Sequence, residues 1–325
     1  MNHRRIRTVL ASLAFALFAG GAAAQAFPSK PVKIIIPFPA GGLSDVLIRG
    51  LGQELSRVWG HTVIAENRPG ANTIIASEAV AKSPADGYTL YMATDAALSS
   101  NQYLYSKLPY DPVKDFTGVI NLVGVPSALV ASPSFPANNL QELIAMAKAK
   151  PGTITYGTFG PGSSTHIDTE AFMRITGIKM LHVPYKGIAE VIPAVLAGQI
   201  DVALSGVAPA LTLLRSGKLK AIAHAGDTRS TVLPNVPTFI ESGAPGFVSR
   251  AWFGLVAPAA TPRTVIDKVA TDVNKIVIEK AFDEKFISGV GLEPLIMRPD
   301  QFNAFLKTNR EMYAERIKNV GVKLD

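Results

Sequence analysis

The sequence contains no cysteine, and this absence excludes disulfide bonds, thiolate metal ligands and a cysteine nucleophile. It has no block rich in lysine and arginine, so a nucleic-acid partner is not expected. Beyond the N-terminal region, no stretch reaches the roughly 18 uncharged apolar residues that a transmembrane helix needs. The five histidines show no spacing typical of metal ligands. The chain is therefore expected to fold on its apolar core alone, without metal or cofactor.

Residues 1–26 have the three parts of a secretory signal peptide. Arg4, Arg5 and Arg7 form a basic start, an apolar run follows, and small residues end the segment. We expect cleavage after Ala26, with Ala24 nearly as favourable, and export to the periplasm. An uncleaved membrane anchor is disfavoured because the apolar run is short. Removal of the three arginines lowers the formal net charge from +7 to +4.

Beyond the signal peptide, apolar runs alternate with amphipathic segments, which predicts the α/β class with helices on both faces of a parallel sheet. Strands are expected at residues 32–38, 61–66, 89–93, 116–123, 127–131, 153–157, 182–184, 199–204, 219–225 and 252–257. Helices are expected at residues 45–59, 74–82, 139–150, 166–176, 187–197, 263–279 and 300–319. A mature chain of about 300 residues is long enough for two medium domains.

Two breaks in this alternation, near Pro126 and Arg250, divide the chain into two lobes. We assign residues 27–126 and 251–325 to lobe one and residues 127–250 to lobe two. Two chain crossings between two α/β lobes predict a two-lobed clamp of the periplasmic-binding-protein type (type II-like), with a cleft between the lobes. Ligands of open α/β sheets lie beyond the carboxyl ends of strands, so loops at those ends should face the cleft.

The loop after the first strand is the first candidate for ligand binding. Two prolines and a glycine pair separate the strand from a helix whose start is expected to be capped by Ser44 and Asp45. Free N–H groups and the positive end of the helix dipole suit such a junction to an anion. A plain tight turn is the alternative. The candidate residues are Phe38, Ala40, Gly41, Ser44 and Asp45.

Three further segments complete the candidate loops. Lobe one adds Thr94 and Ala97 after its third strand. Lobe two adds Thr158 and the Gly/Ser-rich loop Gly162, Ser163, Ser164 and Thr165, which again follows a strand and opens a helix. Its hydroxyl groups could instead only cap their own helix, above all that of Thr165. An exported hydrolase using Ser163 or Ser164 with His166 is a weaker alternative, because the loop is not G-x-S-x-G and no acid is evidently placed to orient His166.

Nine short motifs in a fixed order cover nearly the whole mature chain. They are FPSKP (27–31), PFPAGG (37–42), ENRPGA (66–71), SPADGYTL (83–90), LPYDP (108–112), HVPYKG (182–187), GQID (198–201), LPNVPT (233–238) and WFG (252–254). In these motifs the chain resembles the Bug-type (Bordetella uptake gene) receptors of tripartite tricarboxylate transporters. Each motif is short, but their number and order make the resemblance specific.

The resemblance implies a non-enzymatic periplasmic clamp that binds a small carboxylate, such as a di- or tricarboxylate, an acidic amino acid or an aromatic acid. Its partners would be membrane transporter subunits or a sensor kinase, and we expect a monomer. The sequence departs from the family pattern at Ala40, Leu43 and His224. His224 is expected either to approach the far end of the ligand or to be a surface histidine at the end of its strand. Arg250 is expected either to pair with a distal carboxylate or to be a solvated hinge residue.

Overall fold

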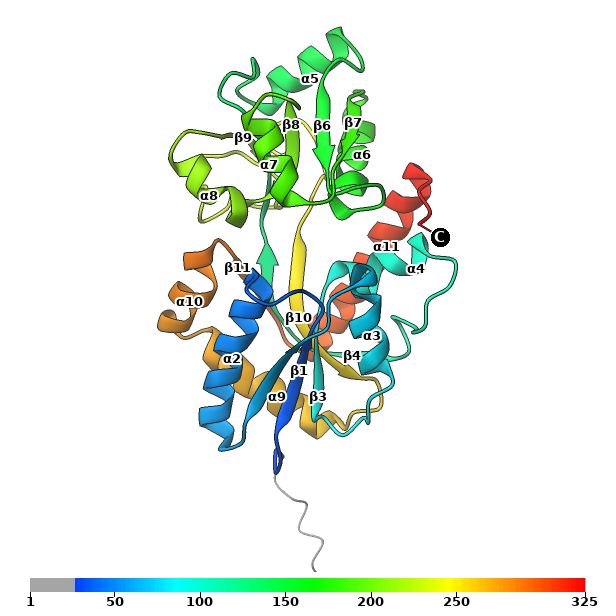
Figure 1. The fold of residues 1–325 in the computed structure, drawn as a ribbon, viewed down its shortest axis with the longest axis vertical. Helices are drawn as coiled ribbons and strands as arrows, with labels where there is room; N and C mark the ends of the chain where they lie inside the picture. Colours follow the sequence, from blue (N-terminus) through cyan, green and yellow to red (C-terminus); the bar gives the residue numbers. More distant parts are fainter. Residues whose placement is uncertain (1–26, 325) are drawn as a thin grey trace, which may run out of the picture.

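The computed structural model describes residues 27–324, so the predicted signal peptide lies outside the described residues. These residues form two α/β lobes, placed one above the other in Figure 1. Lobe one contains a six-stranded sheet of order β11-β4-β10-β3-β1-β2, and lobe two a five-stranded sheet of order β7-β6-β8-β5-β9. No helix within the described range is both long and apolar enough to cross a membrane.

The strands of lobe one are β1 (Val32–Ile36), β2 (Val63–Asn67), β3 (Thr89–Ala93), β4 (Phe116–Val125), β10 (Ala251–Pro258) and β11 (Glu293–Met297). Its helices are α2 (Leu43–Trp59), α3 (Ile74–Ala81), α4 (Asn101–Leu104), α9 (Arg263–Val277), α10 (Lys280–Phe286) and α11 (Pro299–Val320), with short helical turns η1 (Ala71–Thr73), η2 (Ala96–Ser100) and η3 (Ser288–Val290).

Lobe two is built from one continuous stretch of chain. Its strands are β5 (Ser127–Ala131), β6 (Thr155–Thr158), β7 (Leu181–Pro184), β8 (Val202–Gly206) and β9 (Lys220–His224). Its helices are α5 (Leu140–Ala149), α6 (Ser164–Thr176), α7 (Ile188–Leu196) and α8 (Val207–Arg215). Asn139 caps α5, accepting a hydrogen bond from the Glu142 N–H.

Both sheets are mixed, so the prediction of a parallel sheet is wrong. In lobe one, β1 is parallel to β2 and β3, but β10 is antiparallel to β3 and β4, and β11 to β4. In lobe two, β6 is parallel to β7 and β8, but β5 is antiparallel to β8 and β9. For the pair β4–β10, the reason is that β4 leads out of lobe one into β5, while β10 returns from lobe two beside β4. Two such crossings necessarily run in opposite directions.

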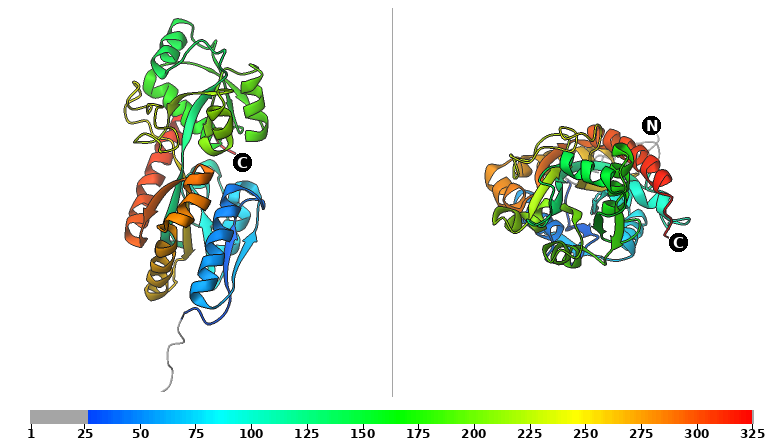
Figure 2. Two further views of the ribbon diagram at one scale, coloured as in Figure 1. Left: turned by 90° about the vertical axis from the view of Figure 1, so that its left-hand side faces the viewer. Right: turned by 90° about the horizontal axis from the view of Figure 1, so that it is seen from above.

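A third contact between the lobes is made by α11. This C-terminal helix starts in lobe one, runs along the side of the molecule and reaches α6 of lobe two (Figures 1 and 2). Arg316 of α11 lies within hydrogen-bond distance of Asp168 of α6. The lobes are therefore joined by two strand crossings and by a packed helix.

Helix α2 shows how the sequence places the first candidate loop. Leu47, Ile48, Leu51 and Leu55 recur at helical spacing and are fully buried in the core of lobe one. This buried face fixes the helix axis, and Gly60 ends the helix in the left-handed conformation. Because α2 is held along its length, its first turn is presented to the space between the lobes.

Candidate functional site

A pocket of about 660 Å³ lies between the two lobes. Lobe one contributes the β1–α2 loop, a residue of β10 and a residue of η3, and lobe two contributes the starts of α7 and α8. The lining residues are Phe38, Pro39, Ala40, Gly42, Leu43, Ser44, Val290, Phe253, Ile188, Ala208 and Pro209. Of the residues predicted from the sequence, the pocket includes Phe38, Ala40 and Ser44. Its volume is in the range typical of small-molecule sites.

The first turn of α2 offers unpaired polar groups to this pocket. The helix begins at Leu43, not at Asp45, and its N-cap is Gly42, which has no side-chain capping bond. Within residues 27–324, the N–H groups of Leu43 and Ser44 and the Ser44 hydroxyl have no hydrogen-bond partner. N–H groups of a first turn point out of the helix and carry its positive partial charge. Ser44 is 3% exposed and lines the pocket.

Asp45 orders the loop from within. Its carboxylate accepts hydrogen bonds from the Gly41 N–H (2.9 Å), from Arg49 Nε (3.0 Å) and from Asn67 Nδ2 (2.9 Å). Asn67 also donates to the Phe38 carbonyl (3.0 Å). Gly41 has φ of +86°, a conformation that glycine adopts without strain. The Asp45 carboxylate is thus engaged by its own loop, by α2 and by β2, and we interpret its role as holding the glycines in place.

The pKa of Asp45 provides a test of this role. The hydrogen bond from Arg49, with the Gly41 N–H and Asn67, lowers the pKa of the Asp45 carboxyl to about 2. Since the folded-state pKa lies below the unfolded value of 3.8, this stabilisation is present above about pH 4 and is lost as the pH falls towards 2.

We therefore expect Asp45→Asn to lower the free energy of unfolding by about 1–2 kcal/mol near neutral pH, because it removes the charge from these hydrogen bonds. The loss stays moderate because Arg49 is half-exposed, and solvent weakens its interaction with the carboxylate. The difference should shrink below about pH 4. Urea denaturation at several pH values measures both. Glu54→Gln, in the exposed Arg57–Glu54 pair of the same helix, is the control and should leave stability unchanged. An equal loss in both variants would contradict the role given to Asp45.

The lobe-two loop is held mainly by its own hydroxyl groups. Ser163 is the N-cap of α6, and its Oγ donates to the Gly160 carbonyl (2.7 Å) and accepts from the His166 N–H (3.3 Å). Thr165 Oγ1 accepts from the Phe159 N–H (3.2 Å). Gly162 has φ of +75°, and a Cβ built there would lie 2.9 Å from the Leu324 side chain. The C-terminal residues therefore cover part of this loop, which does not line the pocket described above.

The same loop lacks the geometry of a serine hydrolase. His166 Nδ1 accepts a hydrogen bond from the Gly162 N–H (3.2 Å), so this nitrogen cannot take a proton from a serine. Within the described residues, no serine hydroxyl is bonded to an imidazole nitrogen of His166. The His166 and His182 rings stack with centroids 4.3 Å apart. Burial lowers the pKa of both imidazoles, which favours their neutral forms.

The other predicted residues lie outside the pocket. Thr94, Ala97 and Thr158 are buried, and Thr158 Oγ1 lies 2.6 Å from His182 Nε2. His224 ends β9 but is buried, so the expectation of a surface histidine is wrong. Its Nδ1 lies 3.2 Å from both the Gly226 N and the Thr228 O, and burial lowers its pKa.

Arg250 donates from Nη2 to Asp227 at 2.7 Å, and Ser164 is half-buried near the start of α6. The structure thus brings together one of the two predicted loops and parts of α7, α8, β10 and η3 that the sequence did not indicate.

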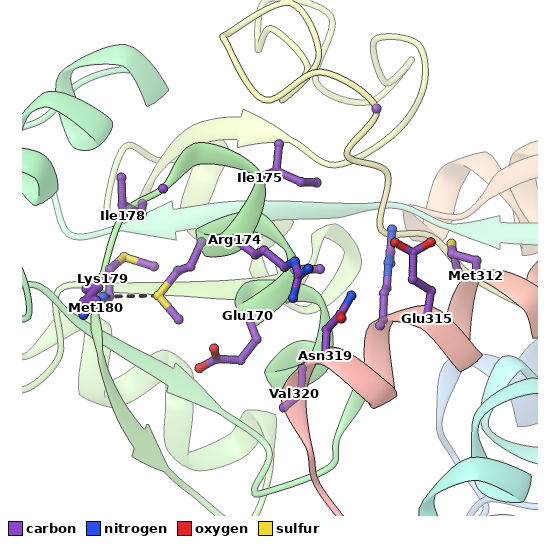
Figure 3. A pocket seen from close by; sticks show the side chains of 15 residues that line it. Glu170, Arg174, Ile175, Ile178, Lys179, Met180, Met312, Glu315, Asn319 and Val320 are labelled. Atoms are coloured by element: carbon purple, nitrogen blue, oxygen red, sulfur yellow. Dashed lines mark hydrogen bonds between the residues drawn. The ribbon is translucent and has the colours of Figure 1, made fainter.

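A larger depression of about 910 Å³ lies elsewhere, between α6 and α11 (Figure 3). Its lining mixes opposite charges, with Glu170 and Glu315 beside Arg174, Lys179 and Arg316. No residue predicted to bind ligand lines it. We therefore place the candidate site in the smaller pocket, where both lobes meet the first turn of α2.

Comparison with known proteins identifies the family. The profile described as "Tripartite tricarboxylate transporter family receptor" matches residues 47–322. Protein BugT of Bordetella pertussis is 35% identical over 326 residues, covering 100% of both chains.

Two solved structures of 29–30% identity are also similar. The R. palustris protein Rpa4515 with adipate superposes with a TM-score of 0.79 over 91% of this chain and 99% of its own. MatC from Rhodopseudomonas palustris with bound malate has a TM-score of 0.73, covering 90% of this chain and 100% of its own. The family whose profile matches the chain is a family of receptors rather than of enzymes. The chain belongs to the family of tripartite tricarboxylate transporter receptors.

Proposed function

We propose that this protein is a periplasmic receptor that captures a small carboxylate between its two lobes. The observation that carries the proposal is the inter-lobe pocket, in which the first turn of α2 offers unpaired N–H groups and the Ser44 hydroxyl. Such groups hold a carboxylate without a formal positive charge. The similar structures that contain adipate and malate support the same ligand class.

In this proposal the two lobes have different roles. The β1–α2 loop binds the carboxylate first, with Phe38, Ala40 and Ser44 lining the pocket and Gly41 shaping the loop. Lobe two then closes over the ligand by rotation about the two strand crossings, and bound ligand favours the closed state through contacts made only there. The loop of residues 162–165 would approach the ligand in that step, directly or through ordered water.

The recipient of the ligand is proposed to be the membrane subunits of a tripartite transporter rather than a sensor kinase. The family assignment supports a transporter partner, and the predicted signal peptide supports export with cleavage near Ala26. A monomeric receptor exposes both lobes to such a partner. Closure would change the relative positions of the lobe surfaces, so the partner could distinguish loaded from empty receptor.

The proposal is tested by placing a negative charge at Ala40, which is exposed and lines the pocket. Ala40→Asp should weaken carboxylate binding about tenfold to a hundredfold, because two like charges a few ångströms apart repel in a partly desolvated site. Ala40→Asn, which has the same shape without the charge, should bind within about threefold of the parent. Calorimetric titration of ligand-free protein with mono- and dicarboxylates measures the affinities.

Thermal unfolding without ligand controls for folding. Its midpoint temperature should be the same for both variants, since residue 40 is exposed. If no small carboxylate binds to protein shown to be ligand-free, the proposed function is wrong. Equal weakening in both variants would instead point to a steric effect and remove the β1–α2 loop from the anion site.

A further inference from the structure

We propose that Gly291 is a positioning residue of the inter-lobe pocket: because it has no side chain, the lobes approach closely enough at this point to hold a carboxylate from both sides. The inference rests on the proposed function and adds the contact that sets the separation of the two walls. This contact lies between the end of η3 in lobe one and the first turn of α8 in lobe two. Val290, which precedes Gly291, and Ala208 both line the pocket.

Both walls of the pocket offer N–H groups from the first turns of helices. Lobe one supplies those of Leu43 and Ser44. Lobe two supplies those of Ile188 in α7 and of Ala208 in α8, and within residues 27–324 neither has a hydrogen-bond partner. A ligand can accept hydrogen bonds from both walls only if their separation matches its length, because donor and acceptor must lie within about 3.2 Å. The separation of the lobes therefore governs the affinity.

The lobes touch where Gly291 faces the first turn of α8. Gly291 is buried and has φ of +81° at the end of η3. A Cβ built on it would lie 3.0 Å from the Cα and 3.1 Å from the Cβ of Ala208. Carbon atoms in favourable contact are about 3.5–4.0 Å apart. Glycine is thus required here by the left-handed backbone and by the lack of space.

Neither side of this contact can move alone. In lobe one, the fully buried Ile287 and Leu292 flank η3, and the Leu292 N–H donates to the Ile287 carbonyl at 3.0 Å. In lobe two, Val207 is fully buried and its N–H donates to the Pro126 carbonyl at 2.8 Å. Close-packed interiors transmit strain instead of absorbing it. A side chain at position 291 would therefore push lobe two as a whole away from lobe one.

Two substitutions that differ in size and in backbone preference test this. Asparagine is larger than alanine but tolerates the left-handed conformation better. If side-chain size governs the affinity, Gly291→Asn should weaken carboxylate binding more than Gly291→Ala, whereas backbone strain alone would give the opposite order. Calorimetric titrations of ligand-free protein with succinate, adipate, hexanoate and benzoate measure the affinities. We expect Gly291→Asn to bind the tightest of these four about tenfold or more weakly than the parent, as the loss of one hydrogen bond to a carboxylate implies.

Gly60 provides a matched control. It ends α2 as Gly291 ends η3, with φ of +67°, and a Cβ built on it would have nothing within 4 Å. Gly60→Ala and Gly60→Asn therefore add similar backbone strain without a contact between lobes, and they should leave the affinities unchanged within error. Urea denaturation without ligand measures the stability of each variant. If Gly291→Asn does not fold, the comparison of Gly291→Ala with Gly60→Ala tests the inference.

The outcomes separate this inference from the proposed function. If both Gly291 variants bind as tightly as the parent, or if Gly291→Ala binds more weakly than Gly291→Asn, the inference is overturned and the carboxylate receptor stands. Equal weakening in the Gly60 variants would also overturn it, because these add strain far from any lobe contact. If neither the four ligands nor any other small carboxylate binds to the parent, the proposed function fails, and the inference fails with it.

Discussion

Replacing Asp168 by alanine is expected to lower the free energy of unfolding by about 3–5 kcal/mol near neutral pH. Asp168 of α6 is 2% exposed, and its carboxylate accepts hydrogen bonds from Arg316 Nη1 (2.5 Å) and Ser249 Oγ (2.5 Å). The alanine variant would leave the Arg316 guanidinium largely buried without its carboxylate. Most of the expected loss comes from this uncompensated charge.

The effect should be large because this ion pair joins three parts of the fold. Arg316 belongs to α11 of lobe one, Asp168 to α6 of lobe two, and Ser249 to the segment that returns to β10. Arg316 Nη2 also donates to the Val248 carbonyl at 2.7 Å. Burial raises the pKa of the Asp168 carboxyl, whereas Arg316 and Ser249 act in the opposite direction. The pair therefore contributes to how the C-terminal helix is held against lobe two.

Urea denaturation followed by circular dichroism measures the loss. Asp300→Asn, in the exposed Arg263–Asp300 pair, is the control and should leave the midpoint unchanged within error. The double variant Asp168→Leu with Arg316→Met should regain much of the stability, since apolar residues of similar volume often replace a buried pair without loss. If Asp168→Ala costs no more than the exposed control, the structural importance given to the pair is wrong.

Most of the fold could be predicted from the sequence, because strong periodicity marks elements that bury one face. The strands at 89–93 and 127–131 coincide with β3 and β5. Helices α4, α8 and α10 and strand β11 were missed. Pro209 and Pro294 weaken the local signals of α8 and β11, and α4 and α10 have only four and seven residues. The strand directions were predicted wrongly, although the two crossings that place β10 antiparallel to β4 were expected from the sequence.

The candidate site was predictable only in part. The β1–α2 loop has a local signature of proline, glycine and serine, and the pocket includes it. The facing wall, with Ile188, Ala208 and Phe253, consists of ordinary apolar residues that only the packing of two lobes brings together. In the lobe-two loop, the hydroxyl groups of Ser163 and Thr165 form hydrogen bonds with the backbone of their own loop. The sequence alone did not decide whether these hydroxyl groups cap the helix or bind ligand.

Replacing Asp95 by asparagine is expected to have the opposite effect to the loss of Asp45 or Asp168. Asp95 follows β3, is 7% exposed, and accepts a hydrogen bond from the Tyr313 hydroxyl at 2.7 Å. Burial raises the pKa of its carboxyl to about 6, with the nearby Asp168 charge adding to the shift and the Tyr313 bond opposing it. The folded state thus holds Asp95 ionised near neutral pH at a cost. An asparagine can keep the Tyr313 bond without the charge.

The sign of the pH dependence follows from the two pKa values. Between the unfolded value of 3.8 and the folded value of about 6, the folded state binds more protons, so the stability contributed by Asp95 falls as the pH rises through this window. At about pH 8, Asp95→Asn should therefore raise the free energy of unfolding by about 2–3 kcal/mol, and the gain should vanish towards pH 4. Urea denaturation across this range measures the difference, with the exposed Glu284→Gln as a control that should show no such trend. An asparagine variant that is less stable than the parent at about pH 8 would mean that the ionised carboxylate stabilises this contact with α11.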